Sequence, residues 1–427
     1  MKFIVIGITD SHRPFFPPEV LEVIKRGKVF SGGKRHHEIV ATLLPSDAEW
    51  IDITVPLDAV FERYESLCGE TEEHPIVVFA SGDPLFFGFA NTLQREFPDA
   101  EMVVYPTFNS LQMLAHRMVI PYHDMHVVSL TGRPWDKLDE ALINGYPLIG
   151  CLTDKQKTPH AIHQRMTEYG YDNYVMTVGE HLGNNTAERV SRYDSKTDYD
   201  NPNCVILQQT EPRIRRFGIP DQEFTLLDGR DKMITKMPIR LLTLQALELR
   251  TKHVLWDIGF CTGSVSIEAK LQFPHLQIEA FEIRPECEAI IQENARRFGA
   301  PGINIHIGDI LENERVKSEK WINGKWINGK CPDAVFIGGH GGHLKEIMEK
   351  VLTVLAPDGV IVMNSVIAPK VTTDSQKLWN EACEELGLKQ DPPTRIQLND
   401  NHPITILKVK RERVKNERVK SEKWLNG

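Results

Sequence analysis

The sequence predicts an α/β protein built from two successive domains and a short tail. Two observations lead to this prediction. Short apolar runs, typical of buried strands, alternate with amphipathic stretches, and the alternation breaks once in a polar segment with prolines and glycines. The 427 residues also suit two or three domains. We therefore expect a first domain over 1–210, a linker over 211–232, a second domain over 233–410 and a tail over 411–427.

In the first domain, six apolar runs are predicted as strands, with helices between most of them. Short apolar strands that alternate with helices favour a mostly parallel sheet covered on both faces. The expected strands are 3–7, 75–80, 101–105, 126–130, 146–152 and 203–207, and the clearest helices are 85–96, 109–118 and 158–169.

The second domain repeats this pattern and ends in a hairpin-like pair. Its expected strands are 253–259, 278–283, 303–309, 333–339 and 359–366, followed by 393–398 and 403–409. Helices are expected at 264–272, 285–298, 343–354 and 372–387. We predict a Rossmann-like domain from this second series.

Composition excludes several classes of protein. Hydrophobic residues make up 41% and charged residues 26%, which is ordinary for a globular chain with real cores. The sequence has no apolar run of the ~18–20 residues that a membrane span needs, and its first residues suit a strand better than a signal peptide. Its seven cysteines form no C-x-x-C pair, so we expect a reducing cytoplasm, no disulfide framework and no zinc site. Three H-x-x-H pairs are attributed to chance, and no metal is expected.

Charge is distributed unevenly along the chain. The net charge is −9, but 313–330 carries +3 and 408–427 carries +5, which leaves −17 for the rest. These basic segments hold near-copies of one sequence, at 313–324 and 416–427, so we interpret 311–330 as a duplicated low-complexity insertion. Since an acidic body repels phosphate backbones, we expect no nucleic-acid partner. The alternative is that the basic copies bind nucleic acid or a partner protein.

The strongest functional motif lies in the second domain, where VLWDIGFCTGSVSIEAK predicts a strand, a tight loop and a helix. Asp257 ends the strand, and Gly259 and Gly263 let the backbone turn sharply and approach a ligand. The helix N-terminus then offers free N–H groups. Glu282 closes the next strand, where it could accept both ribose hydroxyls, and Asp309 follows the third, where an adenine would lie. Because G-x-G-x-x-G is absent, this arrangement favours S-adenosylmethionine (SAM) over a dinucleotide.

Residues 233–240 (MITKMPIR), DIGFCTGSVSIE, FEIRPE and DAVFIGGHGG (333–342) resemble the decarboxylating precorrin methyltransferase domain of cobalamin synthesis. Cys261 stands where that family has the middle glycine of the loop, so we expect weaker SAM binding. The resemblance implies that SAM is bound by Thr235, Asp257, Gly259, Cys261, Gly263, Glu282, Asp309 and Ile310. His340 in the glycine loop is the candidate for catalysis, and Asn364 and Arg240 are the candidates for substrate binding.

Residues 77–90 (VVFASGDPLFFGFA), 105–118, 128–135, 151–159 and 179–189 resemble the tetrapyrrole methylases, in their member that acts at carbon 5. The first loop of that fold corresponds here to Gly7–Ser11 and keeps one glycine. The resemblance implies SAM contacts at Gly82, Asp83, Leu85, Ser110 and Thr153. Arg133 closes a strand where open α/β sheets bind ligands, so it is a candidate for the substrate.

In this order, the two resemblances imply a SAM-dependent enzyme of cobalamin synthesis that methylates a precorrin or cobalt-precorrin. We assign carbon 5 to the first domain, and carbon 15 with decarboxylation of the ring C acetate to the second. A polycarboxylate tetrapyrrole requires local cations, for which we consider Lys34, Arg35, His36, His37, Arg133, Lys236 and Arg240. We expect a homo-oligomer with no membrane partner. The alternatives are a SAM-dependent RNA or DNA methyltransferase and a non-catalytic corrinoid-binding protein with decayed sites.

Overall fold

The computed structural model describes residues 1–67, 74–230, 233–313, 321–322, 325–326, 331–366, 375–398 and 403–411. Most of the predicted insertion and nearly all of the predicted tail lie outside these residues. No helix among the described residues is long and apolar enough to cross a membrane. The chain divides into two compact units: the first holds 1–134, 146–165 and 172–212, and the second holds 135–145, 166–171 and 213–427.

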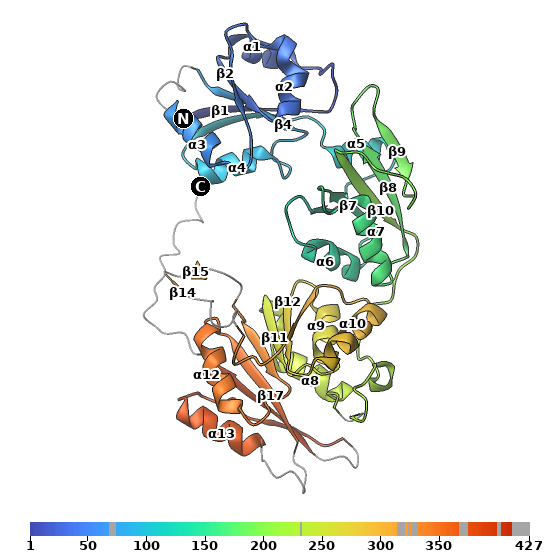
Figure 1. Cartoon of the computed structure of the whole chain (residues 1–427), viewed down its shortest axis with the longest axis vertical. Helices are drawn as coiled ribbons and strands as arrows, with labels where there is room; N and C mark the ends of the chain where they lie inside the picture. The colour runs from blue at the N-terminus through green and yellow to red at the C-terminus, as the bar shows by residue number, and fades with distance from the viewer. Residues whose placement is uncertain are drawn as a thin grey trace. The chain divides into compact units, whose positions relative to one another are not determined.

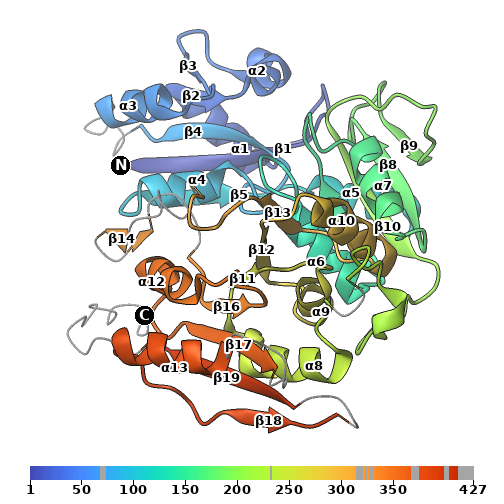
Figure 2. The same cartoon turned by 60° about the horizontal axis from the view of Figure 1, so that its bottom comes forward.

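The first unit begins with a parallel sheet in the order β3-β2-β4-β1-β5. Its central strands β1 and β4 run side by side (Figure 2). Apolar residues of α1 and α2 pack on one face of the sheet, and those of α3 and α4 pack on the other. The strands are β1 (Lys2–Ile8), β2 (Val29–Gly32), β3 (Glu49–Asp52), β4 (Ile76–Ser81) and β5 (Glu101–Tyr105). The helices are α1 (Pro18–Arg26), α2 (Lys34–Val40), η1 (Ala41–Leu43), α3 (Asp58–Ser66) and α4 (Phe89–Glu96).

A second sheet follows in the order β6-β7-β10-β8-β9, and only its β6–β7 pair is parallel. The predicted mostly parallel sheet is therefore confirmed for β1–β5 but does not hold for this second sheet. The short connection between β8 and β9 makes them antiparallel neighbours, and β10 then inserts between β7 and β8. The strands are β6 (His126–Ser129), β7 (Leu148–Leu152), β8 (Tyr174–Glu180), β9 (Arg189–Arg192) and β10 (Asn203–Gln209). The helices along this stretch are α5 (Ser110–Met118), which packs on the sheet, α6 (Asp136–Asn144) and α7 (Pro159–Glu168).

The second unit contains a seven-stranded sheet in the order β13-β12-β11-β16-β17-β19-β18. Five strands are parallel, and β19 and β18 close the edge as an antiparallel pair, which confirms the predicted Rossmann-like series. The strands are β11 (Val254–Ile258), β12 (Gln277–Glu282), β13 (Ile303–Ile307), β16 (Ala334–Ile337), β17 (Val360–Val366), β18 (Thr394–Ile396) and β19 (Ile404–Lys410). A small pair, β14 (Trp321–Ile322) and β15 (Lys325–Trp326), lies within the predicted insertion.

Helices cover both faces of this sheet. Helices α8, α9 and α10 lie on one side of it, and α12 and α13 lie on the other (Figure 1). Their apolar side chains pack on the sheet. The helices are η2 (Asp221–Glu223), α8 (Met237–Ala246), η3 (Leu249–Thr251), α9 (Ser264–Gln272), α10 (Glu286–Phe298), α12 (Leu344–Val354) and α13 (Ser375–Glu385). From β11 the chain builds outward to β12 and β13, and it returns to add β16 on the other side. The strand order thus reverses at β11, and open α/β sheets bind ligands beyond the carboxyl ends of their strands at such a point.

Candidate active site

The loop after β11 is shaped by close backbone contact with the loop after β16. A Cβ on Gly259 would lie 2.6 Å from the backbone nitrogen of Gly339, and Gly259 has φ +77°. Only glycine fits both requirements. Cys261 also has a positive φ, +48°, although it carries a side chain. Its backbone is therefore in a conformation that costs a non-glycine residue about 1 kcal/mol.

Two cavities open at these strand ends. The first, which we call the Glu282 cavity, has a volume of about 460 Å³. It brings together five of the residues that the sequence singled out: Gly259, Glu282, Asp309, Ile310 and His340. The second, the Asp257 cavity, has a volume of about 400 Å³ and brings together Thr235, Asp257, Gly259, Cys261 and Asn364. Both volumes lie in the ~300–1,000 Å³ range of small-molecule sites.

The carboxylate of Glu282 is buried and accepts several N–H groups. The backbone N–H of Cys261 donates to Oε2 at 3.0 Å, and the Arg284 side chain donates to both oxygens, from Nε at 3.0 Å and from a terminal nitrogen at 2.7 Å. Burial works to raise the pKa of Glu282, but the hydrogen bonds from Arg284 and Cys261 outweigh it and lower the pKa below its ordinary value. Glu282 is thus held as an anion.

Asp257 has the opposite electrostatic environment. It is 1% exposed, and its Oδ2 accepts a hydrogen bond from the Ser266 hydroxyl at 2.6 Å, whereas its Oδ1 has no hydrogen-bond partner. The Thr262 hydroxyl, in the same cavity wall, is also buried without a partner. Burial, with a smaller contribution from the charge of Glu282, raises the pKa of Asp257 to about 7. Two buried polar groups in one cavity therefore lack the partner that such groups normally have.

Asn364 lies within β17 at the wall of the Asp257 cavity, where its side-chain amide donates to the Thr243 hydroxyl at 2.9 Å. His340 lines the Glu282 cavity, and its Nδ1 accepts a hydrogen bond from the backbone of Gly342 at 3.2 Å. Burial and the neighbouring His343 lower the pKa of His340. A neutral imidazole at this position can accept a proton.

Two of the site residues predicted for the second domain lie outside both cavities. Arg240 is fully buried and pairs with Glu268 at 3.2 Å and with Asp221 at 3.3 Å. It also donates to backbone carbonyls, so no part of its guanidinium faces a substrate and the predicted substrate contact is wrong. Gly263 precedes α9 with φ +71°, and a Cβ there would collide with Ile291 at 2.3 Å. Its role in the described structure is close packing of the loop against α10.

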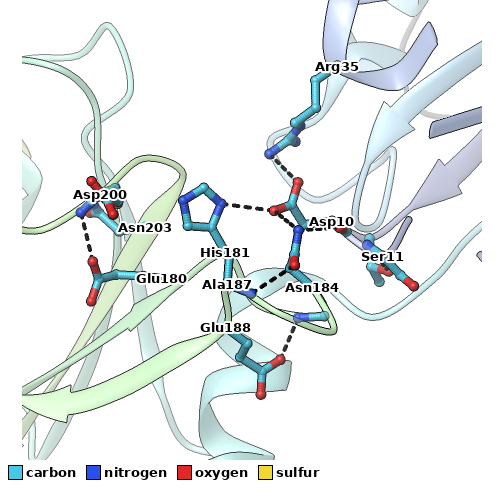
Figure 3. Close-up of polar contacts among 12 residues, drawn as sticks. Asp10, Ser11, Arg35, Glu180, His181, Asn184, Ala187, Glu188, Asp200 and Asn203 are labelled. Carbon is cyan, nitrogen blue, oxygen red and sulfur yellow. Dashed lines mark hydrogen bonds and ion pairs between the residues drawn. The ribbon is translucent and has the colours of Figure 1, made fainter. Parts of the chain in front are cut away.

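In the first unit, a smaller pocket of about 140 Å³ lies beyond the ends of β1 and β4, and we call it the Asp10 pocket. Asp10 joins Arg35 at 3.0 Å and His181 Nδ1 at 3.0 Å, and the Asn184 side chain donates to its backbone carbonyl at 3.2 Å (Figure 3). Arg35 also donates to the Ser81 hydroxyl at 2.9 Å. His181 and Asn184 were missed in the prediction of site residues, although both belong to the quoted motif at 179–189.

Only some of the site residues predicted for the first domain lie at the Asp10 pocket. Gly82 and Ser110 line the Asp10 pocket. The Thr153 hydroxyl donates to the side chain of Asn203, which lines it, at 2.7 Å. Asp83, Leu85 and Arg133 do not line the pocket. Asp83 accepts a hydrogen bond from the backbone N–H of Leu85, and the Leu85 side chain is 46% exposed. Arg133 is also exposed, and its guanidinium lies 5.4 Å from the ring centre of Phe87.

Comparison with known proteins adds to this geometry. Family models match both halves, tetrapyrrole (corrin/porphyrin) methylases over residues 2–195 and the precorrin methyltransferase domain over residues 228–411. A precorrin-6Y C(5,15)-methyltransferase [decarboxylating] from Sinorhizobium sp is 31% identical over 389 residues, which are 90% of this chain and 88% of that protein. This chain belongs to the precorrin-6Y C(5,15)-methyltransferase family. The predicted fold class and order of domain families are therefore confirmed.

Two shorter relatives of this precorrin-6Y C(5,15)-methyltransferase are each named for methylation at a single carbon. A cobalt-precorrin-6B C(15)-methyltransferase (decarboxylating) from Salmonella typhimurium is 40% identical over 44% of this chain and 93% of that protein. A cobalt-precorrin-7 C(5)-methyltransferase from the same organism is 28% identical over 42% of this chain and 84% of that protein. A solved precorrin-6y C5,15-methyltransferase from Geobacter metallireducens is 30% identical over 46% of this chain and 98% of that one, with a TM-score of 0.37. Methyltransferases of this family use SAM.

Proposed function

We propose that this protein methylates a polycarboxylate tetrapyrrole, a precorrin or cobalt-precorrin, at carbons 5 and 15, and removes the ring C acetate carboxyl as carbon dioxide in cobalamin synthesis. The observation that carries this proposal is the relative named for all three steps, which covers 90% of the chain. The two adjoining cavities at the carboxyl ends of β11, β12 and β16 support it, because they provide room for a donor beside a second ligand.

We assign carbon 15 and the decarboxylation to the domain over 233–410, with SAM as donor. Glu282 would hold the ribose, Asp309 and Ile310 the adenine, and Thr235, Asp257 and Cys261 the methionine part. The unpartnered oxygens of Asp257 and Thr262 fit this group, because the ammonium and carboxylate of a methionine can supply their missing partners. When bound, SAM supplies an electrophilic methyl group.

The protein's own contribution is chiefly positional. A macrocycle carbon is already electron-rich, so holding it in line with the donor can lower the barrier by several kcal/mol without a strong base. The Asp257 cavity is lined mainly by apolar side chains, among them Ile239, Val265 and Phe336. An acetate carboxylate held against these apolar side chains, and not on the Lys236 or Arg284 cations that also line the cavity, would lose hydration, which favours departure of carbon dioxide and delocalisation of the electron pair into the macrocycle. Neutral His340 and the amide of Asn364 would contact the substrate.

We assign carbon 5 to the domain over 1–210, joined by the linker 211–232. The match to the tetrapyrrole methylases and the C(5)-methyltransferase relative support this assignment. Gly82, Asp83, Leu85, Ser110 and Thr153 remain the proposed donor contacts, with Arg133 for the substrate. The Asp10 pocket, at about 140 Å³, is smaller than a whole SAM molecule requires. We therefore describe no methyl-transfer step at this pocket.

We keep three further expectations as proposals: a homo-oligomer, a cytoplasmic location and no nucleic-acid partner. Five described cysteines, Cys151, Cys204, Cys261, Cys287 and Cys383, are buried free thiols, which supports a reducing compartment. The excess negative charge outside the two basic segments supports the absence of nucleic acid.

Incubation of the full chain with the precorrin substrate and SAM tests the proposal by mass spectrometry. The product should gain two methyl groups and lose one carbon dioxide. An unchanged substrate mass contradicts it. If calorimetry also detects no SAM binding, the chain is instead a non-catalytic corrinoid-binding protein.

A further inference from the structure

The Glu282 carboxylate has more hydrogen-bond donors than a carboxylate readily accommodates. Five N–H groups point at it: the backbone N–H groups of Cys261, Ile283 and Arg284, and two from the Arg284 guanidinium, at donor–oxygen distances of 2.7–3.2 Å. Two carboxylate oxygens offer about four lone-pair positions. Glu282 is therefore fully occupied in this structure.

A ribose held by Glu282 needs part of this capacity. The three backbone N–H groups are fixed where the loop after β11 meets the end of β12, so they cannot withdraw without unfolding the turn. The Arg284 side chain is different, because it is 25% exposed and ends a flexible stem. The ribose of SAM can thus reach the carboxylate only if the Arg284 guanidinium moves away.

The Arg284 guanidinium lies where it can also bind a second ligand. Arg284 lines both the Glu282 cavity and the Asp257 cavity, and its other terminal nitrogen lies 3.4 Å from the sulfur of Met233, a neutral and weak acceptor. Once it leaves Glu282, the other carboxylates that line these cavities, Asp309 and Asp257, are the ones that we assign to SAM. A carboxylate of a tetrapyrrole in the adjoining cavity would supply an anionic partner, in the planar geometry that guanidinium groups bind well.

We propose that Arg284 positions the two ligands in turn: it leaves Glu282 when the donor ribose binds and then holds a carboxylate of the macrocycle. This inference rests on the proposed function, since it assumes the donor at Glu282. Its consequence is positive coupling, in which each ligand raises the affinity for the other by the same factor. The macrocycle draws Arg284 away from Glu282, and the donor frees Arg284 for the macrocycle.

Calorimetry with the full chain tests this coupling, with S-adenosylhomocysteine as the donor probe and uroporphyrin, an octacarboxylate porphyrin, as the macrocycle probe. In the wild-type chain, uroporphyrin should tighten S-adenosylhomocysteine binding at least about fivefold, the lower end of common couplings. Arg284→Met should bind S-adenosylhomocysteine at least threefold more tightly than wild type in the absence of porphyrin. It should also lose the effect of porphyrin.

Three further variants make the result specific. Arg230→Met removes a neighbouring guanidinium that also contacts Met233 but not Glu282, and it should behave as wild type. Glu282→Gln identifies which binding event belongs to this site. Arg284→Lys keeps the positive charge but has a single nitrogen, so it cannot bind both Glu282 oxygens in the same way and should give an intermediate affinity. It decides the question if thermal unfolding shows that Arg284→Met does not fold.

Unchanged or weaker S-adenosylhomocysteine binding in Arg284→Met, or coupling that persists there, overturns the role of Arg284 while leaving the proposed function intact. Absence of binding to the wild-type chain would instead contradict the donor assignment itself, and this inference with it.

Discussion

The backbone N–H of Cys261 donates to Oε2 of Glu282 at 3.0 Å, and this contact joins the turn after β11 to the end of β12. To make it, Cys261 adopts φ +48°, the left-handed conformation that suits glycine. The contact therefore depends on local backbone strain, which should lower the free energy of unfolding by an amount that variants at Cys261 can measure.

We predict that Cys261→Gly is more stable than Cys261→Ala by about 1 kcal/mol, because alanine keeps the strained Cβ and glycine removes it. Denaturant unfolding of the two variants measures the difference. Cys287 on α10 provides the matched control, since it is a buried cysteine in a helix. There, Cys287→Ala should be more stable than Cys287→Gly by about 1 kcal/mol. If the alanine variant were the more stable one at both positions, the result would refute the strain at Cys261.

Ligand affinity should depend on pH through Asp257. Its pKa is raised to about 7, so the carboxyl is largely neutral at pH 6 and largely charged at pH 8. Only the charged form attracts an ammonium, so S-adenosylhomocysteine binding should tighten severalfold across this range. Calorimetry at several pH values tests this, and Asp257→Asn should bind weakly with little pH dependence. An Asp257→Asn profile that matches wild type would contradict the assignment.

The same pKa shift predicts the direction of a stability change. The folded-state pKa of Asp257 lies above its ordinary value of 3.8, so between about pH 4 and pH 7 the folded protein keeps a proton that the unfolded chain has released. The free energy of unfolding should therefore fall as pH rises through this window. Hydrogen exchange of core amides in β11 measures it. Asp257→Asn should reduce the slope, whereas Asp47→Asn, at an exposed position, should not.

Arg240 should prove structural. Arg240→Met leaves the fully buried Glu268 without its cation, which typically costs about 3–5 kcal/mol. The double variant Arg240→Met/Glu268→Leu should recover part of this loss, but not all, because Glu268 also accepts the backbone N–H groups of Gly218 and Ile219. Urea unfolding measures the series. The exposed pair Arg216–Glu223 is the control, where Arg216→Met should cost about 1 kcal/mol or less.

Arg240 also shows where sequence reasoning stops. The strand, loop and helix from Asp257 to Ser264 could be predicted, because glycine spacing and the helix start are local properties of the chain. The partners of Arg240 lie 19 and 28 residues away, and His181 lies 171 residues from Asp10. Burial and pairing over such separations depend on tertiary packing. The same reason explains the second sheet, where β10 inserts between strands that precede it.

The last prediction concerns Arg35, which reaches Asp10 at 3.0 Å and the Ser81 hydroxyl at 2.9 Å in the wall of the Asp10 pocket. If this pocket belongs to the carbon-5 site, Arg35→Met should slow carbon-5 methylation at least about tenfold, a barrier change of about 1.4 kcal/mol. The carbon-15 methyl and the loss of carbon dioxide should remain, since we assign those steps to the other domain.

Mass spectrometry of the reaction over time separates the two outcomes, because a product with a single methyl group and no ring C carboxyl should accumulate with Arg35→Met. Lys25→Met is the control, an exposed cation on α1 that does not line the pocket, and its product should carry both methyl groups. Equal loss in the two variants would point to a general effect of charge on substrate attraction. That result would remove Arg35 from the carbon-5 site and leave its contacts with Asp10 and Ser81 as structural.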